Sequence, residues 1–342
     1  IVWDFGDGTG AEGANPVSHA FATAGVYTVK ATVTNATDAA FATVEIQVIA
    51  YVRYVSPNGS HTPPFDTWEK AATNIQAAVY AVEIAGGLVL VTNGVYDVGA
   101  RVAGGQATTN RLALDKAVRV ESVNGPAVTA IAGRWHSEAA PLGAAALRCV
   151  YIGAGATLCG FTVSNGATAY STAGNNGRGG GLFVAAGGLA TNCVIAGCRA
   201  WSGGGASGAS GSGGELRGCE VRNNLALNAG SNNRGGGVAD LTLVGCTVAS
   251  NTAYNGGGAY MCALDRCALT ANASTSQGGG AYDCTLNDCE LRGNVATNNA
   301  GGGAYYGTLT RCRLYDNTST GSSYGGGAYD ATLYSCVLSG NT

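Results

Sequence analysis

Recurrent acidic side chains are the first residues of this chain whose type and spacing could do chemistry. Three aspartates hold one position of a repeated sequence on alternate repeats: Asp240, Asp283 and Asp330. If the repeats stack like neighbouring strands, these carboxylates lie roughly 9.6 Å apart, a gap that suits an inverting pair around a glycosidic bond. Other repeats place Met261 and Tyr306 there. We therefore favour a solvated surface column over a catalytic pair.

A tyrosine precedes each position of that column from Met261 onward. The tyrosine column consists of Tyr260, Tyr282, Tyr305 and Tyr329. Aromatic columns can stack sugars. In an unbroken strand, however, Tyr282 shares the parity of Cys284 and Leu286, which would turn the rings inward as packing. We expect a structural ladder rather than a sugar platform.

Cysteine and asparagine recur in the same repeat. In the regular copies a cysteine stands eleven residues after the first glycine of a triple, and an asparagine follows five residues later. The predicted columns are Cys219, Cys246, Cys267, Cys289, Cys312 and Cys336, and Asn224, Asn251, Asn272, Asn294, Asn317 and Asn341. Asparagine at an inward turn can bond the turn backbone and the amide of the next repeat.

The cysteines are best interpreted as small buried residues. Stacked neighbours lie just within disulfide reach, so oxidation of some pairs stays open. Metal binding is less expected, because no histidine follows His136 and no Cys-x-x-Cys pair exists.

Glycine triples mark the repeat that must position these columns. They begin at Gly179, Gly203, Gly235, Gly256, Gly278, Gly301 and Gly325, and the last four intervals are 21, 22, 23 and 24 residues. Such a period is typical of a solenoid. Alternation in Cys-x-Leu turns both side chains inward, and each coil must pair its backbone with its neighbours. The sequence predicts a parallel β-helix over residues 111–342, regular from about 179.

Residues 51–110 predict a cap for the open end of that solenoid. Asp66 or Thr67 is predicted to N-cap one amphipathic helix. Its apolar stripe carries Trp68, Ala71, Ile75, Ala78, Val79 and Val82. A helix followed only by strands can cover the apolar interior and unpaired edge of the first coil.

Residues 1–50 alternate apolar and polar side chains between turns, which predicts antiparallel strands. Asp4 and Asp7 lie in a glycine-rich turn. A calcium ion is possible there, but such carboxylates more often accept hydrogen bonds from their own backbone, and we expect no cofactor.

Composition narrows the partners. Charged residues make up 11% of the chain and the net charge is −3, which gives no electrostatic footprint for nucleic acid. No apolar run is long enough to span a membrane. A surface rich in Ser, Thr, Asn and Gly suits neutral, hydroxyl-rich partners such as polysaccharides. The chain starts and stops inside repeating or strand-like sequence, so we expect it to be a piece of a longer protein.

Three stretches resemble known families. Trp-Asp-Phe-Gly-Asp-Gly at residues 3–8 with the later Tyr-Thr-Val resembles the PKD-type immunoglobulin-like module, which implies a partial β-sandwich and a spacer or carbohydrate-adjacent role in secreted proteins. Tyr-Val-Ser-Pro-Asn-Gly and Val-Thr-Asn-Gly-Val-Tyr resemble the caps of pectate-lyase-like proteins. The repeats are similar to those of bacterial cell-surface proteins likened to polymorphic outer-membrane proteins. Together these resemblances imply a right-handed parallel β-helix.

The overall prediction is an all-β chain: a partial PKD-like sandwich, a cap with one helix, and a right-handed parallel β-helix. We expect a non-catalytic structural or adhesive rod of a secreted or cell-surface protein. The alternatives are a polysaccharide lyase or glycoside hydrolase, and an end-to-end filament subunit. A lyase needs a basic residue, but lysine is absent after Lys116, and Arg266, Arg292 and Arg311 lack an acidic cluster.

Overall fold

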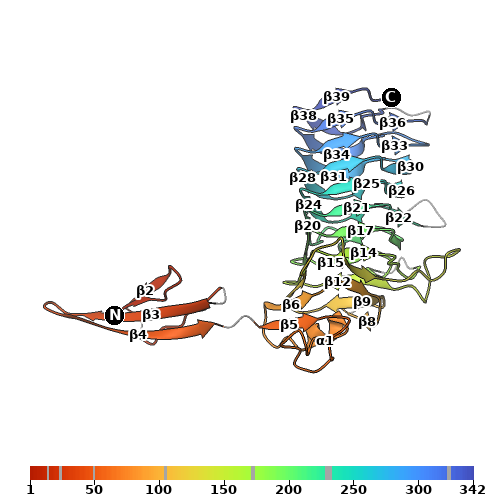
Figure 1. Ribbon diagram of the computed structural model, residues 1–342. Helices are drawn as coiled ribbons and strands as arrows, with labels where there is room; N and C mark the ends of the chain where they lie inside the picture. The colour runs from red at the N-terminus through yellow and green to blue at the C-terminus, as the bar shows by residue number, and fades with distance from the viewer. Residues whose placement is uncertain are drawn as a thin grey trace. The chain divides into compact units, whose positions relative to one another are not determined.

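The computed structural model describes residues 1–13, 15–22, 25–48, 51–103, 106–170, 174–227, 233–321 and 325–342. The chain divides into two compact units, Ile1–Val52 and Arg53–Thr342 (Figure 1).

The N-terminal unit is an antiparallel sheet in the order β2-β1-β3-β4. The strands are β1 (Val2–Asp4), β2 (Gly10–Glu12), β3 (Gly25–Thr34) and β4 (Ala39–Val48). The two longest strands pair along their whole length, from Gly25 opposite Val48 to Thr34 opposite Ala39. Phe5 and Val29 are buried here, whereas most of β4 is exposed.

The larger unit winds its strands into parallel sheets that run along a stack of coils (Figure 1). The long sheet contains β5 (Val52–Val55), β6 (Gly87–Val91), β8 (Arg101–Val102), β9 (Thr109–Leu114), β10 (Val118–Ser122), β12 (Arg148–Ile152), β13 (Thr157–Cys159), β15 (Leu182–Val184), β16 (Leu189–Thr191), β19 (Ala206–Ser207), β20 (Glu215–Arg217), β23 (Val238–Ala239), β24 (Thr242–Val244), β27 (Ala259–Tyr260), β28 (Ala263–Asp265), β31 (Ala281–Asn287), β34 (Ala304–Thr310), β37 (Ala328–Tyr329) and β38 (Thr332–Tyr334).

Two further sheets complete the coils. The second sheet contains β7 (Gly94–Tyr96), β11 (Thr129–Ala132), β14 (Thr162–Ser164), β17 (Val194–Ala196), β21 (Glu220–Arg222), β25 (Thr247–Ala249), β29 (Ala268–Thr270), β32 (Glu290–Arg292), β35 (Arg313–Tyr315) and β39 (Val337–Ser339). The third sheet contains β18 (Arg199–Ala200), β22 (Leu225–Ala226), β26 (Thr252–Asn255), β30 (Ala273–Gln277), β33 (Val295–Ala296) and β36 (Thr318–Ser319).

Parallel pairing keeps equivalent residues of successive coils in register. In the second sheet Leu269 lies opposite Leu291, which in turn lies opposite Leu314. All three side chains are fully buried. Burial of one such side chain is worth about 1.5–3 kcal/mol, so the leucine columns supply much of the driving force for stacking. Parallel pairing from coil to coil makes this unit a β-helix, and the fold is the right-handed parallel β-helix that the sequence predicts.

Sharp corners recur every five residues within a regular coil. In the coil that begins at Gly256, Met261, Arg266 and Ala271 have φ values of 50°, 50° and 52°. This left-handed conformation reverses the side-chain alternation of the strand. The residue after each corner, here a cysteine, a cysteine and an asparagine, is buried.

The glycine triples fit where coils approach closely. A Cβ atom on Gly257 would lie 2.2 Å from the carbonyl oxygen of Ala273, which is closer than any real contact. The third-sheet strand therefore leaves no room for a side chain at this position.

The cap helix is shorter than predicted. Helix α1 runs from Ile75 to Tyr80, and Asn74 is its N-cap, accepting a hydrogen bond from the Ala77 amide at 2.9 Å. Asp66 and Thr67 therefore do not cap it, and Trp68 is exposed. The reason is a β-bridge from Val55 to Ala72, whose backbone groups bond Tyr54 and Ser56 instead of a helical turn.

The cap covers a strand edge with one side chain. Gln76 of α1 donates to the Ala113 carbonyl at 3.1 Å and accepts from the Ala113 amide at 2.8 Å. Both backbone groups of this β9 residue are thus paired without another strand, which protects an edge that would otherwise template association.

Candidate functional site

The tyrosine column forms a continuous stack on the long sheet. Ring centroids of Tyr260 and Tyr282 are 5.0 Å apart, those of Tyr282 and Tyr305 5.3 Å, and those of Tyr305 and Tyr329 5.5 Å. The rings are within 16° of parallel. Each ring face inside the stack therefore meets a neighbouring ring. A sugar cannot lie flat on these faces, and only the ring edges with their hydroxyls remain available.

The rings do not point inward, in contrast to the sequence prediction. Ala259, Ala281 and Ala304 belong to the hydrophobic core, and the tyrosine after each one projects from the opposite face of its strand. Tyr260 and Tyr305 are buried against their own neighbours and lie outside that core. Asp283 lies between Tyr282 and Cys284 and has a φ of 49°, so the two-residue alternation of side chains is interrupted there and the two residues face opposite sides.

The hydroxyls of Tyr260, Tyr282 and Tyr305 are neutral donors at physiological pH. Burial raises the pKa of Tyr260 and of Tyr282 above the usual value. Burial, followed by a hydrogen bond with Tyr306, raises the pKa of Tyr305. The Tyr306 ring is 39% exposed and stands at 66° to Tyr305, with the centroids 4.3 Å apart.

Asp240 departs from the expected solvated column. It is 6% exposed, and its carboxylate forms an ion pair with Arg178 at 2.6 Å, two coils earlier in the stack. Arg178 also donates to the Ser210 hydroxyl at 2.7 Å. This pair could not be predicted from the repeat pattern, because its members are 62 residues apart.

Asp283 and Asp330 are exposed, as expected for a surface column. Among the described residues neither carboxylate takes part in a hydrogen bond or ion pair. Both occupy left-handed corners, with φ values of 49° and 51°, a conformation that aspartate tolerates better than most residues. At the start of the tyrosine stack, the Arg234 guanidinium lies 5.2 Å from the Tyr260 ring centroid.

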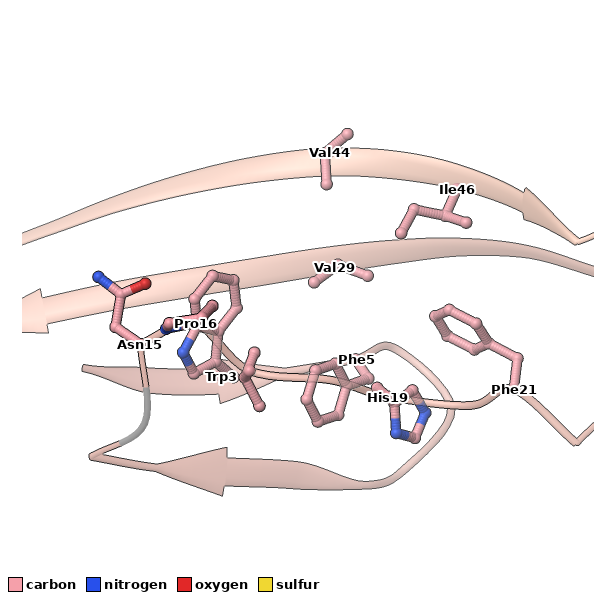
Figure 2. Close-up of a pocket in the computed structure, with 10 residues that line it drawn as sticks. Trp3, Phe5, Asn15, Pro16, His19, Phe21, Val29, Val44 and Ile46 are labelled. Carbon is pink, nitrogen blue, oxygen red and sulfur yellow. The ribbon is translucent and has the colours of Figure 1, made fainter.

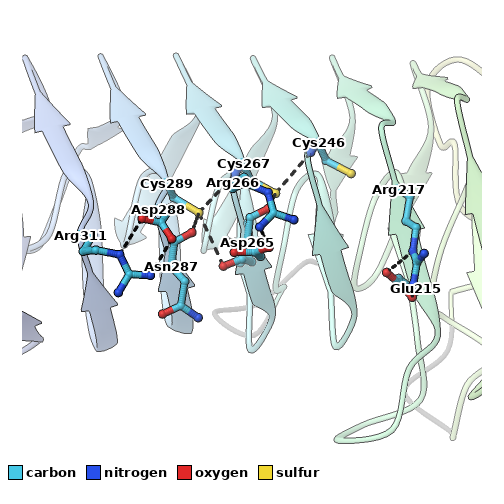
Figure 3. Close-up of polar contacts among 11 residues, drawn as sticks. Glu215, Arg217, Cys246, Asp265, Arg266, Cys267, Asn287, Asp288, Cys289 and Arg311 are labelled. Carbon is cyan, nitrogen blue, oxygen red and sulfur yellow. Dashed lines mark hydrogen bonds and ion pairs between the residues drawn. The ribbon is translucent and has the colours of Figure 1, made fainter.

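A charged ridge follows the corners between the long and second sheets (Figure 3). Arg311 forms an ion pair with Asp288 at 2.7 Å across neighbouring coils, and Arg266 forms one with Asp265 at 2.6 Å. A hollow of about 250 Å³ opens at Asp288, Cys289, Glu290, Arg311 and Arg313. These exposed opposite charges neutralise one another and contribute little to stability.

The predicted asparagine column is a hydrogen-bonded ladder. Each side-chain amide from Asn224 to Asn317 donates to the side-chain oxygen of the next asparagine at 2.9–3.0 Å. The same oxygen accepts the backbone N–H of the earlier asparagine. Cys198 holds the equivalent position one coil earlier, and its N–H donates to Asn224.

The cysteine column is a parallel ladder of free thiols. The backbone N–H groups of Cys219, Cys246 and Cys267 each approach the sulfur of the following cysteine at 3.4 Å. Cys289 and Cys312 are also buried, whereas Cys336 is half-buried. Burial raises the pKa of the Cys262 and Cys149 thiols well above the usual value, so these groups stay protonated.

The two aspartates of the N-terminal turn bond their own surroundings. Asp4 accepts from the Gly6 amide at 2.9 Å. Asp7 accepts from Thr9 and contacts His19 at 2.7 Å. These contacts lower the pKa of Asp7 to about 2. In the described part of the chain, no group of three or more His, Cys, Asp or Glu side chains is placed to hold a metal ion.

The same unit has an apolar hollow of about 370 Å³ (Figure 2). Trp3, Phe5, Val29, Val44 and Ile46 project toward it from the sheet. His19 also lines the hollow; its ring stacks on Phe5 with the centroids 4.0 Å apart, and its Nε2 lies 2.7 Å from the Asp7 carboxylate.

The described helix does not have the length or hydropathy that crossing a membrane requires. The geometry defines the class of the two units: a small antiparallel sheet, and a capped right-handed parallel β-helix whose polar columns bond along the stack. Residues 1–50 match the family model described as the PKD domain. No curated protein sequence matches the chain.

Several solved structures are similar to this chain at low identity. A pectin methylesterase in complex with a hexasaccharide is 13% identical, with a TM-score of 0.47 over 84% of this chain and 93% of that one. Pectin methylesterase PemA from Erwinia chrysanthemi is 12% identical, with the same TM-score and coverage. A rhamnogalacturonan lyase is 13% identical, with a TM-score of 0.41 over 83% of this chain and 87% of that one. Likenesses of this size carry no argument about activity.

Proposed function

We propose that the chain is a non-catalytic structural and adhesive rod that works in a secreted or cell-surface protein and associates with glycans. The asparagine ladder carries this proposal. The most regular polar side chains of the coils are fully buried and bonded to one another, so they hold the stack together and are not available to a substrate.

The remaining carboxylates support the same function. Asp240 is bonded to Arg178, and the ridge carboxylate of Asp288 is bonded to Arg311. Asp283 and Asp330 are exposed on coils separated by a third coil, without a bonded acid or base partner among the described residues. General acid–base catalysis needs a group whose position is set by its surroundings, and no hydrogen bond or ion pair among the described residues holds either carboxylate in place.

The surface composition supports a glycan as the partner. Charged residues make up only 11% of the chain, and the exposed positions of the long sheet include Thr242, Thr285 and Thr332. Hydroxyl and amide groups exchange hydrogen bonds readily with sugar hydroxyls. A position outside the cell agrees with the PKD domain match at residues 1–50.

The test measures polymer length. Soluble neutral and uronate polysaccharides are incubated with the chain and analysed by size-exclusion chromatography before and after incubation. The proposal predicts an unchanged length distribution. A shift toward short chains that is lost in the Asp283→Asn variant would make the protein an enzyme and overturn the proposal.

A further inference from the structure

In the tyrosine column, Tyr260, Tyr282, Tyr305 and Tyr329, stacking holds the hydroxyls in fixed positions, and not all of these hydroxyls are hydrogen-bonded within the protein. Among the described residues, the hydroxyls of Tyr260 and Tyr282 form no hydrogen bond, and neither is a fully buried unpaired atom. Both hydroxyls therefore contact solvent. Their rings are fixed by stacking at 5.0 Å, so little side-chain entropy remains to be lost when a ligand binds.

The corner beside each tyrosine alternates between apolar and acidic residues. Met261 and Tyr306 are exposed at 47% and 39%, while Asp283 and Asp330 are exposed carboxylates on the coils between and beyond them. Equivalent groups thus recur every second coil, roughly 9.6 Å apart. This surface presents donors, acceptors and small apolar contacts in one line parallel to the stack.

We propose that the tyrosine column is a binding site for an uncharged, linear, hydroxyl-rich polysaccharide that lies along the stack of coils. The inference rests on the proposed association with glycans and names the site and the ligand class. The phenol hydroxyls bond sugar hydroxyls from the ring edges, because the ring faces are closed. The unpaired carboxylates of Asp283 and Asp330 accept further sugar hydroxyls.

The same carboxylates exclude acidic glycans. A uronate or sulfate group beside Asp283 would face an uncompensated like charge, which costs affinity. Arg234 is the cation at the start of the column, and it already lies over the Tyr260 ring. The ion pair of Asp240 with Arg178 adds no net charge. The column therefore selects against polygalacturonate and its relatives.

The experiment measures binding of the whole chain to soluble polymers by affinity electrophoresis and calorimetry. The neutral probes are hydroxyethylcellulose, glucomannan and xylan, the anionic probe is polygalacturonate, and the cationic probe is chitosan. The test variant is Tyr260→Phe/Tyr282→Phe, which keeps the stacked rings and removes two hydroxyls. Tyr315→Phe on β35 of the second sheet is the matched control.

We expect at least one neutral probe to bind and polygalacturonate not to bind. The double variant should weaken neutral binding about tenfold, while Tyr315→Phe leaves it unchanged. Asp283→Asn/Asp330→Asn should admit polygalacturonate. Equal affinity of the double variant and the control, tighter binding of chitosan or polygalacturonate, or no binding of any neutral probe overturns the inference. Equal affinity of the two variants or preference for a charged probe leaves the proposed function intact. Absence of binding to every probe removes the association with glycans but not the non-catalytic rod, and cleavage of a probe overturns the proposed function itself.

Discussion

Removal of one internal rung of the asparagine ladder tests how the coils are held together. Asn294 is fully buried. Its side-chain oxygen accepts from the Asn272 N–H and from the Asn272 side-chain amide, both at 3.0 Å. Its own amide donates to the Leu269 carbonyl and to the Asn317 side-chain oxygen, both at 2.9 Å. Asn294→Ala deletes all four contacts.

The expected loss follows from what remains unpaired. The Asn272 backbone N–H has the Asn294 oxygen as its partner, so the variant buries a donor without an acceptor, at a cost of about 1–3 kcal/mol. The other three contacts are worth about 0.5–1.5 kcal/mol each. We therefore expect the free energy of unfolding to fall by roughly 2.5–7.5 kcal/mol, a large part of the total stability of an ordinary domain.

The assay is urea unfolding followed by circular dichroism. Asn287→Ala is the matched control, because this asparagine of β31 lies in the same coil but outside the ladder, and a surface change should cost no more than about 0.5 kcal/mol. A loss for Asn294→Ala below about 1 kcal/mol, or one equal to that of the control, would refute the assignment of the ladder as the main polar element of the stack.

Three further predictions concern corners, acid and thiols. Ala271→Gly should raise the free energy of unfolding and Gly293→Ala should lower it by about 1 kcal/mol, because both corners have a positive φ that glycine adopts more easily than alanine. A Cβ atom on Gly293 would meet no other atom, so the effect there is conformational and not steric. Thermal unfolding should show the two changes in opposite directions. The pKa of Asp7 is lowered to about 2, so the stability that this carboxylate contributes to the N-terminal unit is present above its unfolded pKa of about 3.9 and is lost as the pH falls toward 2. Asp7→Asn should remove this pH dependence, which tryptophan fluorescence follows. An acid transition that is the same in the variant would contradict the prediction. In the native chain a disulfide reagent should modify Cys336 first and leave Cys262 unreacted, and early labelling of Cys262 in peptide mapping would contradict the burial that raises its pKa.

The repeat could be predicted from the sequence because its evidence is redundant. Glycine triples, cysteine and asparagine recur with the same spacing in successive repeats. One coil cannot bury its inward residues alone, so these residues are buried only when the coils stack. The cap helix could not be bounded in the same way. The apolar stripe begins before Ile75, but a β-bridge at Ala72 uses the backbone groups that a helix there would need.

The orientation of the tyrosines was predicted wrongly for a physical reason. An unbroken strand would turn Tyr282 and Cys284 to the same face, but Asp283 between them adopts a left-handed conformation. A signal was present in the sequence: the asparagine stands five residues after the cysteine in every regular coil, and an odd spacing between two inward residues requires a break in a two-residue period.

The neighbourhood of Asp240 could not be derived from the repeat. Its partner Arg178 lies before the regular coils, and the Ser210 that also bonds Arg178 lies in an irregular loop. Contacts of this kind depend on side chains that occur once, so periodicity carries no information about them.

In the proposed function the chain binds a polysaccharide and has a structural role, but does not cleave or modify the polysaccharide. The most direct measurement incubates the whole chain at high concentration with neutral and uronate polysaccharides, with and without calcium, and assays new reducing ends, unsaturated uronates and released ester groups. We expect no product above the buffer blank in any arm. Product formed in proportion to protein, and abolished by Asp283→Asn or Arg292→Gln, would contradict it.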